Sequence, residues 1–209
     1  FKEFINETLP GENTRRLLER IKPDWIFHCA GNSNIQDSFK DPLKDIESNT
    51  FMTFRLLNDI KDYSPQSKIY IFSSAAVYGN PKYLPIKETD TTNPLSPYGF
   101  HKLLSENICK EFSEIYSLNI VILRIFSAYG PGLRRQIFYD LMNKFVNENN
   151  IELKGTGSES RDFIHVLDLC RAIELIMKQE NKLLEIYNIG TGDELSLIHI
   201  SEPTRHHAI

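Results

Sequence analysis

A serine and a Tyr-x-x-x-Lys motif occur where together they could form an acid–base site. Ser74 ends a β-rich run at residues 68–74, and Tyr98 and Lys102 follow in a helix-forming stretch. Residues four apart share one face of a helix, so Tyr98 and Lys102 can point the same way. A nearby ammonium lowers the pKa of a phenol, and a serine hydroxyl can donate to the same oxygen or to a substrate oxygen. Such a group can take a proton from an alcohol.

The residues around the motif support this interpretation. Ser96 and Pro97 have the residue types of a helix N-cap and a first helical position. Tyr98 is therefore expected in the first helical turn, where the positive end of the helix dipole also favours a phenolate. Ser73 and Ser74 stand at the carboxyl end of a strand, which is where sites form in open α/β sheets.

The elements needed to position these residues follow from the hydrophobic pattern. We expect helices at 13–21, 42–63 (opened by Asp41) and 97–116, alternating with strands at 25–30, 68–74 and 119–127. This alternation predicts an α/β fold with a doubly wound parallel sheet. Beyond Gly132 we expect helices at 136–147 and 166–179, strands at 151–154 and 186–189, and a turn at 155–160.

Ordered blocks of residues along most of the chain carry a family resemblance. They are 23–31, Asn49, 73–79, 98–102, 123–132, 155–157, 161–168 and 187–192. With these blocks the chain resembles the extended short-chain dehydrogenase/reductase family. Within that family it is most similar to the NAD-dependent epimerase/dehydratase branch, and there to nucleotide-sugar epimerases typified by UDP-glucose 4-epimerase.

The resemblance implies a Rossmann-like fold divided between two regions. Residues 1–127 would be the remainder of an NAD-binding domain. Residues 128–194 would be a small α/β substrate lobe with segments that return to the sheet. The family opens with a strand, a glycine-rich turn and a helix, and no such motif occurs here. We therefore expect an N-terminally truncated chain that lacks the first βαβ unit and is inactive alone, with a non-native tail at 195–209.

The resemblance also implies roles for individual residues. Tyr98 would be the catalytic base, Lys102 its partner and a ligand of the nicotinamide ribose, and Ser74 the catalytic hydroxyl, since Ser74 rather than Ser73 aligns when 77–79 is fixed. The remaining cofactor-binding residues would be Cys29, Ala30, Gly31, Asn49 and Phe126. Arg161 would bind the substrate diphosphate. Ser127 would also bind the substrate, but it replaces the asparagine usual in the family, so the identity of the sugar is not determined.

The implied reaction is oxidation and re-reduction at a sugar C4. Ala75 and Ala76 stand where 4,6-dehydratases of the family carry an acid pair, and methyl groups cannot move protons. We therefore expect a nucleotide-sugar 4-epimerase that uses NAD, with NADP left open, in surface polysaccharide precursor synthesis. A nucleotide-sugar 4-ketoreductase or dehydrogenase, and a non-catalytic dinucleotide-binding protein, remain as alternatives.

Composition limits the partners of this chain. It has 209 residues, 41% hydrophobic and 25% charged, with a net charge of −4, so nothing indicates nucleic-acid or membrane binding. Cys29, Cys109 and Cys170 lack a CxxC spacing, which suggests buried free thiols in a reducing cytoplasm. No metal site is expected, the histidines at 199, 206 and 207 included. By resemblance we expect a cytoplasmic homodimer, joined through apolar residues of helices 42–63 and 97–116. These residues are Phe51, Phe54, Leu57, Leu103, Leu104 and Phe112.

Overall fold

A computed structural model describes residues 4–134, 136–147, 160–179 and 182–196 of the chain. It divides into two compact units. The first holds residues 1–125 and 180–188, and the second holds residues 126–179 and 189–209. The boundary expected at residue 127 stays a prediction.

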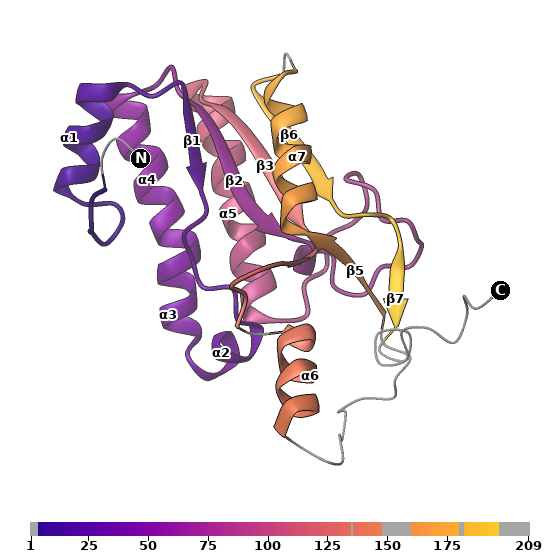
Figure 1. The fold of residues 1–209 in the computed structure, drawn as a ribbon. Coiled ribbons are helices and arrows are strands. Elements are labelled where there is room, and N and C mark those ends of the chain that lie inside the picture. Colours follow the sequence, from indigo (N-terminus) through magenta and orange to yellow (C-terminus); the bar gives the residue numbers. More distant parts are fainter. Residues whose placement is uncertain (1–3, 135, 148–159, 180–181, 197–209) are drawn as a thin grey trace. The chain divides into compact units, whose positions relative to one another are not determined.

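The first unit is built on a parallel sheet (Figure 1). Its strands are β1 (Trp25–His28), β2 (Lys68–Ser74), β3 (Asn119–Ile125) and β6 (Leu184–Ile189), in the order β1-β2-β3-β6. Parallel pairing joins β1 to β2 and β2 to β3, and Ser74 lies opposite Ile125 at the carboxyl end. The expected α/β fold with a parallel sheet is confirmed.

Helices of the first unit bury the apolar residues of β2 and β3. These helices are α1 (Glu12–Ile21), α4 (Met52–Tyr63) and α5 (Pro97–Tyr116). Strands buried on both faces are near-continuous apolar runs, as in 120–123 of β3, where every residue is buried. The shared core contains Leu18, Leu56, Leu57, Ile60, Ile69, Ile71, Cys109, Phe112, Leu118, Ile120 and Ile122.

Local capping explains where several helices begin. Asp41 accepts a hydrogen bond from the Lys44 amide at 3.0 Å and opens α3 (Pro42–Ile46), as expected. The helix expected at 42–63 continues through a π-helical segment, η1 (Glu47–Phe51), into α4. Helix α2 (Ile35–Lys40), a short helix whose N-cap is Asn34, was not expected from the sequence.

The second unit carries a three-stranded sheet in the order β4-β5-β7, together with α6 (Gln136–Asn147) and α7 (Val166–Met177). The strands are β4 (Ser127–Tyr129), β5 (Ser160–His165) and β7 (Glu194–Ser196). The expected strand 119–127 is therefore interrupted at Phe126, whose amide bonds to the Ile189 carbonyl.

Two further expectations of the second region changed. Ser160 begins β5 instead of ending a turn, and Leu195, at the start of the expected tail, pairs with Arg161. The strand expected at 151–154, the turn at 155–159 and the tail residues 197–209 lie outside the described residues.

The expectation of three buried thiols is wrong for two of them. Cys109 is buried in the core, whereas Cys29 and Cys170 are exposed. Cys29 lies just beyond β1. Cys170 lies on α7, on a part of the helix surface that no other described element of the same unit covers. Within the described ranges, no helix is long and apolar enough to cross a membrane.

Candidate active site

The two serines at the end of β2 have different environments. Ser73 is buried, and its hydroxyl donates to the Glu106 carboxylate at 2.5 Å. Ser74 is half-buried and its Oγ accepts a hydrogen bond from the Ala76 amide, capping the short 3₁₀ turn η2 (Ala75–Val77). An acceptor role for Oγ keeps the hydroxyl proton of Ser74 for a different partner, which supports Ser74 as the candidate catalytic hydroxyl.

Tyr98 lies in the first turn of α5, where the cap signals placed it. Ser96 Oγ accepts from the Gly99 amide at 3.1 Å, and the Tyr98 amide donates to Ser38 Oγ at 3.1 Å. A Cβ on Gly99 would lie 2.7 Å from the carbonyl oxygen of Ala76. Glycine therefore lets this turn pack directly on η2, which brings the Tyr98 segment against the segment that follows Ser74.

Lys102 extends along the same helix face toward the end of β2. Its ammonium donates to the carbonyl oxygen of Phe72 at 3.0 Å and lies 5.9 Å from the centre of the Tyr98 ring. Burial lowers the pKa of Lys102 to about 8, and nearby acidic groups, Asp45 foremost, oppose that shift. At neutral pH Lys102 is therefore mainly protonated, although its pKa is lower than that of a lysine in water.

Gly31 and Asn49 meet beside the end of β1. Gly31 has φ of +135°, and a Cβ there would lie 2.6 Å from Asn49 Oδ1. Asn49 sits in η1 and is 1% exposed; its amide nitrogen donates to the Asp45 carbonyl, while Oδ1 has no partner among the described residues. A buried acceptor without a donor costs roughly 1–3 kcal/mol, and π-helical turns often mark functional sites. This unpaired oxygen is suited to a bound ligand.

The other residues expected beyond β1 are Cys29 and Ala30. Cys29 is exposed and lies near enough to Lys102 to act on its pKa, and Ala30 is half-buried. His28 was not among the expected site residues, although a polar residue at the end of an apolar strand is a visible signal. It is 5% exposed, and burial, aided by Lys102, lowers its pKa to about 4, so it is neutral.

A buried ion pair behind the site was also missed. Glu106 and Arg124 join α5 to β3, with Nη2 2.7 Å from Oε2, and both side chains are 5% exposed. Arg124 Nη1 also donates to the Tyr78 hydroxyl at 2.7 Å, and that hydroxyl donates to Asn188 Oδ1 at 2.7 Å. Because Ser73 also bonds to Glu106, this network fixes the end of β2 that carries the candidate serine.

Phe126, Ser127 and Arg161 belong to the second unit, whereas the other predicted site residues belong to the first. Ser127 begins β4 and lies opposite Phe163, and Arg161 is an exposed residue of β5. The neighbouring Asp162 carboxylate accepts hydrogen bonds from Thr191 and Gly192 and holds the turn at 190–192. Within its own unit, Arg161 therefore projects from an ordered strand.

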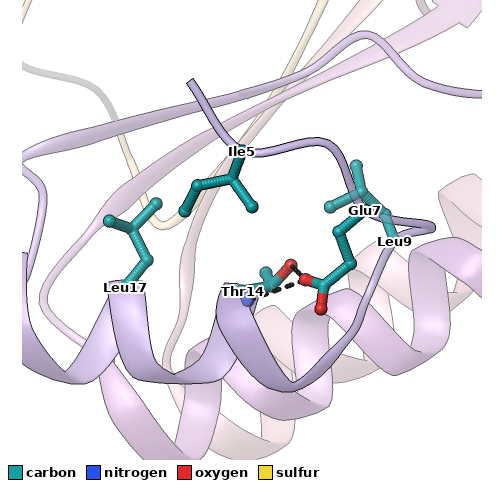
Figure 2. A pocket seen from close by; sticks show the side chains of 5 residues that line it. All are labelled: Ile5, Glu7, Leu9, Thr14 and Leu17. Carbon is teal, nitrogen blue, oxygen red and sulfur yellow. Dashed lines mark hydrogen bonds between the residues drawn. The ribbon is translucent and has the colours of Figure 1, made fainter. Parts of the chain in front are cut away.

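A pocket of about 230 Å³ lies away from these residues, beside α1 (Figure 2). Its apolar walls come from Ile5, Leu9 and Leu17. The Glu7 carboxylate on its edge accepts from the Thr14 hydroxyl and amide at 2.7 and 2.9 Å, so it serves to cap α1. No predicted site residue lines this pocket. In the part of the chain that the structure describes, no group of three His, Cys, Asp or Glu residues could hold a metal ion.

Comparisons with known proteins agree with this fold. Residues 6–190 match the model of the NAD dependent epimerase/dehydratase family. The chain is 32% identical to a UDP-glucose 4-epimerase of Lacticaseibacillus casei, over 91% of this chain and 63% of that protein. It is 27% identical to a dTDP-D-glucose 4,6-dehydratase of Dictyostelium discoideum, over 97% of this chain and 49% of that protein.

A solved structure is similar over nearly the whole chain. It is a UDP-glucuronic acid 4-epimerase from Bacillus cereus in complex with UDP-glucuronic acid and NAD. The TM-score is 0.87 at 28% identity, covering 95% of this chain and 63% of that one. The chain thus spans between about half and two thirds of the length of these proteins.

Proposed function

Because this chain belongs to the NAD dependent epimerase/dehydratase family, we propose that its protein is a nucleotide-sugar 4-epimerase. The observation that carries the proposal is the placement of Tyr98 and Lys102 on one face of α5, with the first turn of that helix packed on the residues after Ser74. The resemblance seen in the sequence is confirmed by the family match, and the activity of the whole protein is inferred from this site.

The residues beyond β1 fit a nicotinamide cofactor. The unpaired Oδ1 of Asn49 offers an acceptor, and Gly31 keeps the backbone beside it free of a side chain. Lys102 would hold the ribose, and Cys29 and Ala30 would line the surface beside it. The family resemblance implies that Phe126, in the second unit, would also bind the cofactor. A bound NAD would supply the hydride chemistry of oxidation and re-reduction at C4. NAD is preferred to NADP here because the Bacillus cereus relative is in complex with NAD.

The chain's own residues would move the proton. Tyr98, as a phenolate, would accept the proton of the C4 hydroxyl and later return it. The Lys102 ammonium would stabilise that phenolate before the proton is taken and again after it is returned. Ser74 would donate its hydroxyl proton to the C4 oxygen and fix the sugar at the end of β2. Inversion at C4 then requires the sugar to present its other face while the nucleotide stays bound.

The nucleotide would be held by the second unit. Arg161 offers a planar fork of donors suited to diphosphate oxygens, and Ser127 offers a short hydroxyl to the phosphate or the sugar. The substrate class is therefore a nucleotide-diphosphate sugar. The particular sugar and the role in surface polysaccharide precursor synthesis remain predictions.

Ala75 and Ala76 argue against a dehydratase, although one relative carries that name. Both alanines lie in η2 immediately after Ser74, so the acid pair needed to remove water has no counterpart at these two positions. A 4-ketoreductase would use the same Tyr98 and Lys102 and stays as the second candidate. A binding protein without catalysis would not require the paired phenol and ammonium.

We also propose that the protein is a cytoplasmic homodimer. Of the apolar residues expected at its interface, Leu57 and Phe112 lie in the core instead, because α4 and α5 turn them toward the sheet. Phe51, Phe54 and Leu104 are exposed and support a partner surface on η1, α4 and α5.

Substitution of the phenol tests the proposed function. In the active protein, Tyr98→Phe should reduce turnover by about 10²–10⁴-fold, since the candidate base is removed, while NADH binding followed by fluorescence persists. Tyr116→Phe, on the exposed end of the same helix, is the matched control. Turnover of Tyr98→Phe near the wild-type rate would contradict the assignment. A product isomeric with the substrate indicates epimerisation, and loss of one water indicates a dehydratase.

A further inference from the structure

Ser38 is a buried serine that joins the short helix α2 to the first turn of α5. Its exposed fraction is 0%, whereas the other five residues of α2 are exposed. The Ser38 hydroxyl donates to the Ile35 carbonyl at 2.7 Å, so its oxygen is left to accept from the Tyr98 amide, 3.1 Å away. The hydroxyl thus uses its proton within α2 and its oxygen on the residue that carries the candidate base.

The bond to Ser38 gives the first turn of α5 a second cap. Amides in the first turn of a helix have no carbonyl of that helix to bond to. The local cap, Ser96, accepts from the Gly99 amide at 3.1 Å, and Pro97 has no amide hydrogen. The Tyr98 amide is reached by Ser38, which lies 60 residues earlier in the chain. Helix α2 therefore holds the backbone nitrogen next to the Cα from which the phenol extends.

Helix α2 is in turn tied to the residues beyond β1. A helix of six residues is too short to be stable by itself, so contacts with other segments must hold it. Asn34 caps it by accepting from two amides of its first turn. Asn32, one residue beyond Gly31, donates from Nδ2 to the Asp45 carboxylate at 2.7 Å. The short helix thus connects the loop after Gly31 to the turn of α5 that carries the phenol.

We propose that Ser38 is a positioning residue, which sets where the Tyr98 phenol lies relative to the Gly31 loop and Lys102. The Lys102 end of this helix face is held separately, by the bond of the ammonium to the Phe72 carbonyl at 3.0 Å. Loss of the Ser38 hydroxyl removes the acceptor of a buried amide, which is unfavourable. The first turn of α5 then shifts toward another acceptor, and the phenol moves with it.

The test follows the Tyr98 ring by ¹⁹F NMR in the 209-residue chain labelled with 3-fluorotyrosine, and Tyr98→Phe identifies its signal. Ser38→Ala removes only the hydroxyl, so the Tyr98 signal should shift or split. Ser67→Ala is the matched control. Ser67 is also 0% exposed, and its hydroxyl donates to the Pro23 carbonyl at 2.5 Å, just before the amino end of β2. Its loss should leave the Tyr98 signal in place.

A Tyr98 signal that stays in place in folded Ser38→Ala overturns the proposal, even if the variant is less stable, because Ser38 then only supports the fold. An equal shift in Ser67→Ala also overturns it, because any destabilisation would then move the ring. If Ser38→Ala does not fold, Ser38→Cys decides, since a thiol is a weaker acceptor of similar shape. Its Tyr98 signal should be displaced, and a signal at the wild-type position would contradict the proposal.

The effect on catalysis rests on the proposed function and is measured separately. In the active protein, Ser38→Ala should lower kcat by about 10–10²-fold with little change in KM, because a displacement of about 1 Å can cost 10²-fold in rate. An unchanged kcat would overturn the positioning role. A wild-type protein without epimerase activity would instead refute the proposed function, and the ¹⁹F signal would still decide whether Ser38 positions the ring.

Discussion

The buried pair Glu106–Arg124 makes the strongest prediction about stability. Glu106→Gln keeps the size of the side chain but leaves the Arg124 guanidinium without a negative charge. In the wild type, Arg124 Nε donates to both carboxylate oxygens, at 3.1 and 3.2 Å, and Nη2 donates to Oε2 at 2.7 Å. A glutamine must turn an amide N–H₂ toward one of these donors, so at least one bond is lost together with the charge.

The expected loss is large because both side chains are only 5% exposed. Removing one partner of a buried ion pair costs about 3–5 kcal/mol. Since Arg124 Nη1 keeps its bonds to Tyr78 and the Glu88 carbonyl, we expect the lower end, about 3 kcal/mol. Domains have about 5–15 kcal/mol in total. With a urea m-value of about 2 kcal/mol/M, the unfolding midpoint should fall by about 1.5 M.

Urea unfolding followed by circular dichroism measures this change. The matched control is Asp168→Asn, whose pair with Arg171 is 2.9 Å long but has side chains 56% and 74% exposed. An exposed pair contributes about 0–1 kcal/mol, so that midpoint should barely move. Glu106→Leu/Arg124→Met removes both charges and should be more stable than Glu106→Gln. A midpoint shift for Glu106→Gln as small as that of Asp168→Asn would refute the reasoning.

Two further substitutions test the packing and the electrostatics of the site. Gly99→Ala should destabilise the protein by about 1–3 kcal/mol in urea unfolding, because the new Cβ would meet the Ala76 carbonyl. Replacing a helical glycine by alanine ordinarily stabilises a helix, so a stabilised Gly99→Ala variant would contradict this contact. His28 stays neutral in the folded protein down to a pKa of about 4, whereas the unfolded chain binds that proton near its ordinary value of 6.5. Stability should therefore fall as pH drops from 6.5 to 4, and His28→Gln should reduce the loss between pH 7 and 4.5 by about 2–3 kcal/mol; equal losses in both proteins would exclude this role for His28.

Local signals account for the parts of the fold that could be predicted. The strand at 68–74 and the helix at 97–116 have the predicted bounds. Both signals, an apolar run and the Ser96–Pro97 cap, consist of residues that are adjacent in the sequence. Helix α2 has too few residues to show a period, and only its Asn34 cap marks it. The π-helical segment depends on packing against other elements, which no local pattern reports.

The residues of the candidate site also fall into those that local sequence signals identify and those that depend on distant partners. Tyr98, Lys102 and Ser74 could be identified because motif spacing and strand ends are local features. Asp45 and Glu106 look like surface positions of amphipathic helices, since each is a charged residue within a mixed sequence. Their burial depends on partners distant in the chain: His101 lies 56 residues from Asp45, and Arg124 lies 18 residues from Glu106. Long-range pairs of this kind require the three-dimensional structure.

Asn188 has a consequence for the order in which the chain folds during synthesis. It accepts from the Tyr78 hydroxyl, 110 residues earlier, and donates to the Ile86 carbonyl, 102 residues earlier. The backbone amide of Asn188 donates to the Glu88 carboxylate, 100 residues earlier. Ribosomes add roughly 5–20 residues per second, so Asn188 is synthesised about 5–20 s after the loop residues that it binds. A nascent chain can therefore hold Ser74, Tyr98 and Lys102 with that loop still open to proteases, and chains arrested on either side of Asn188 should differ in cleavage at 80–93.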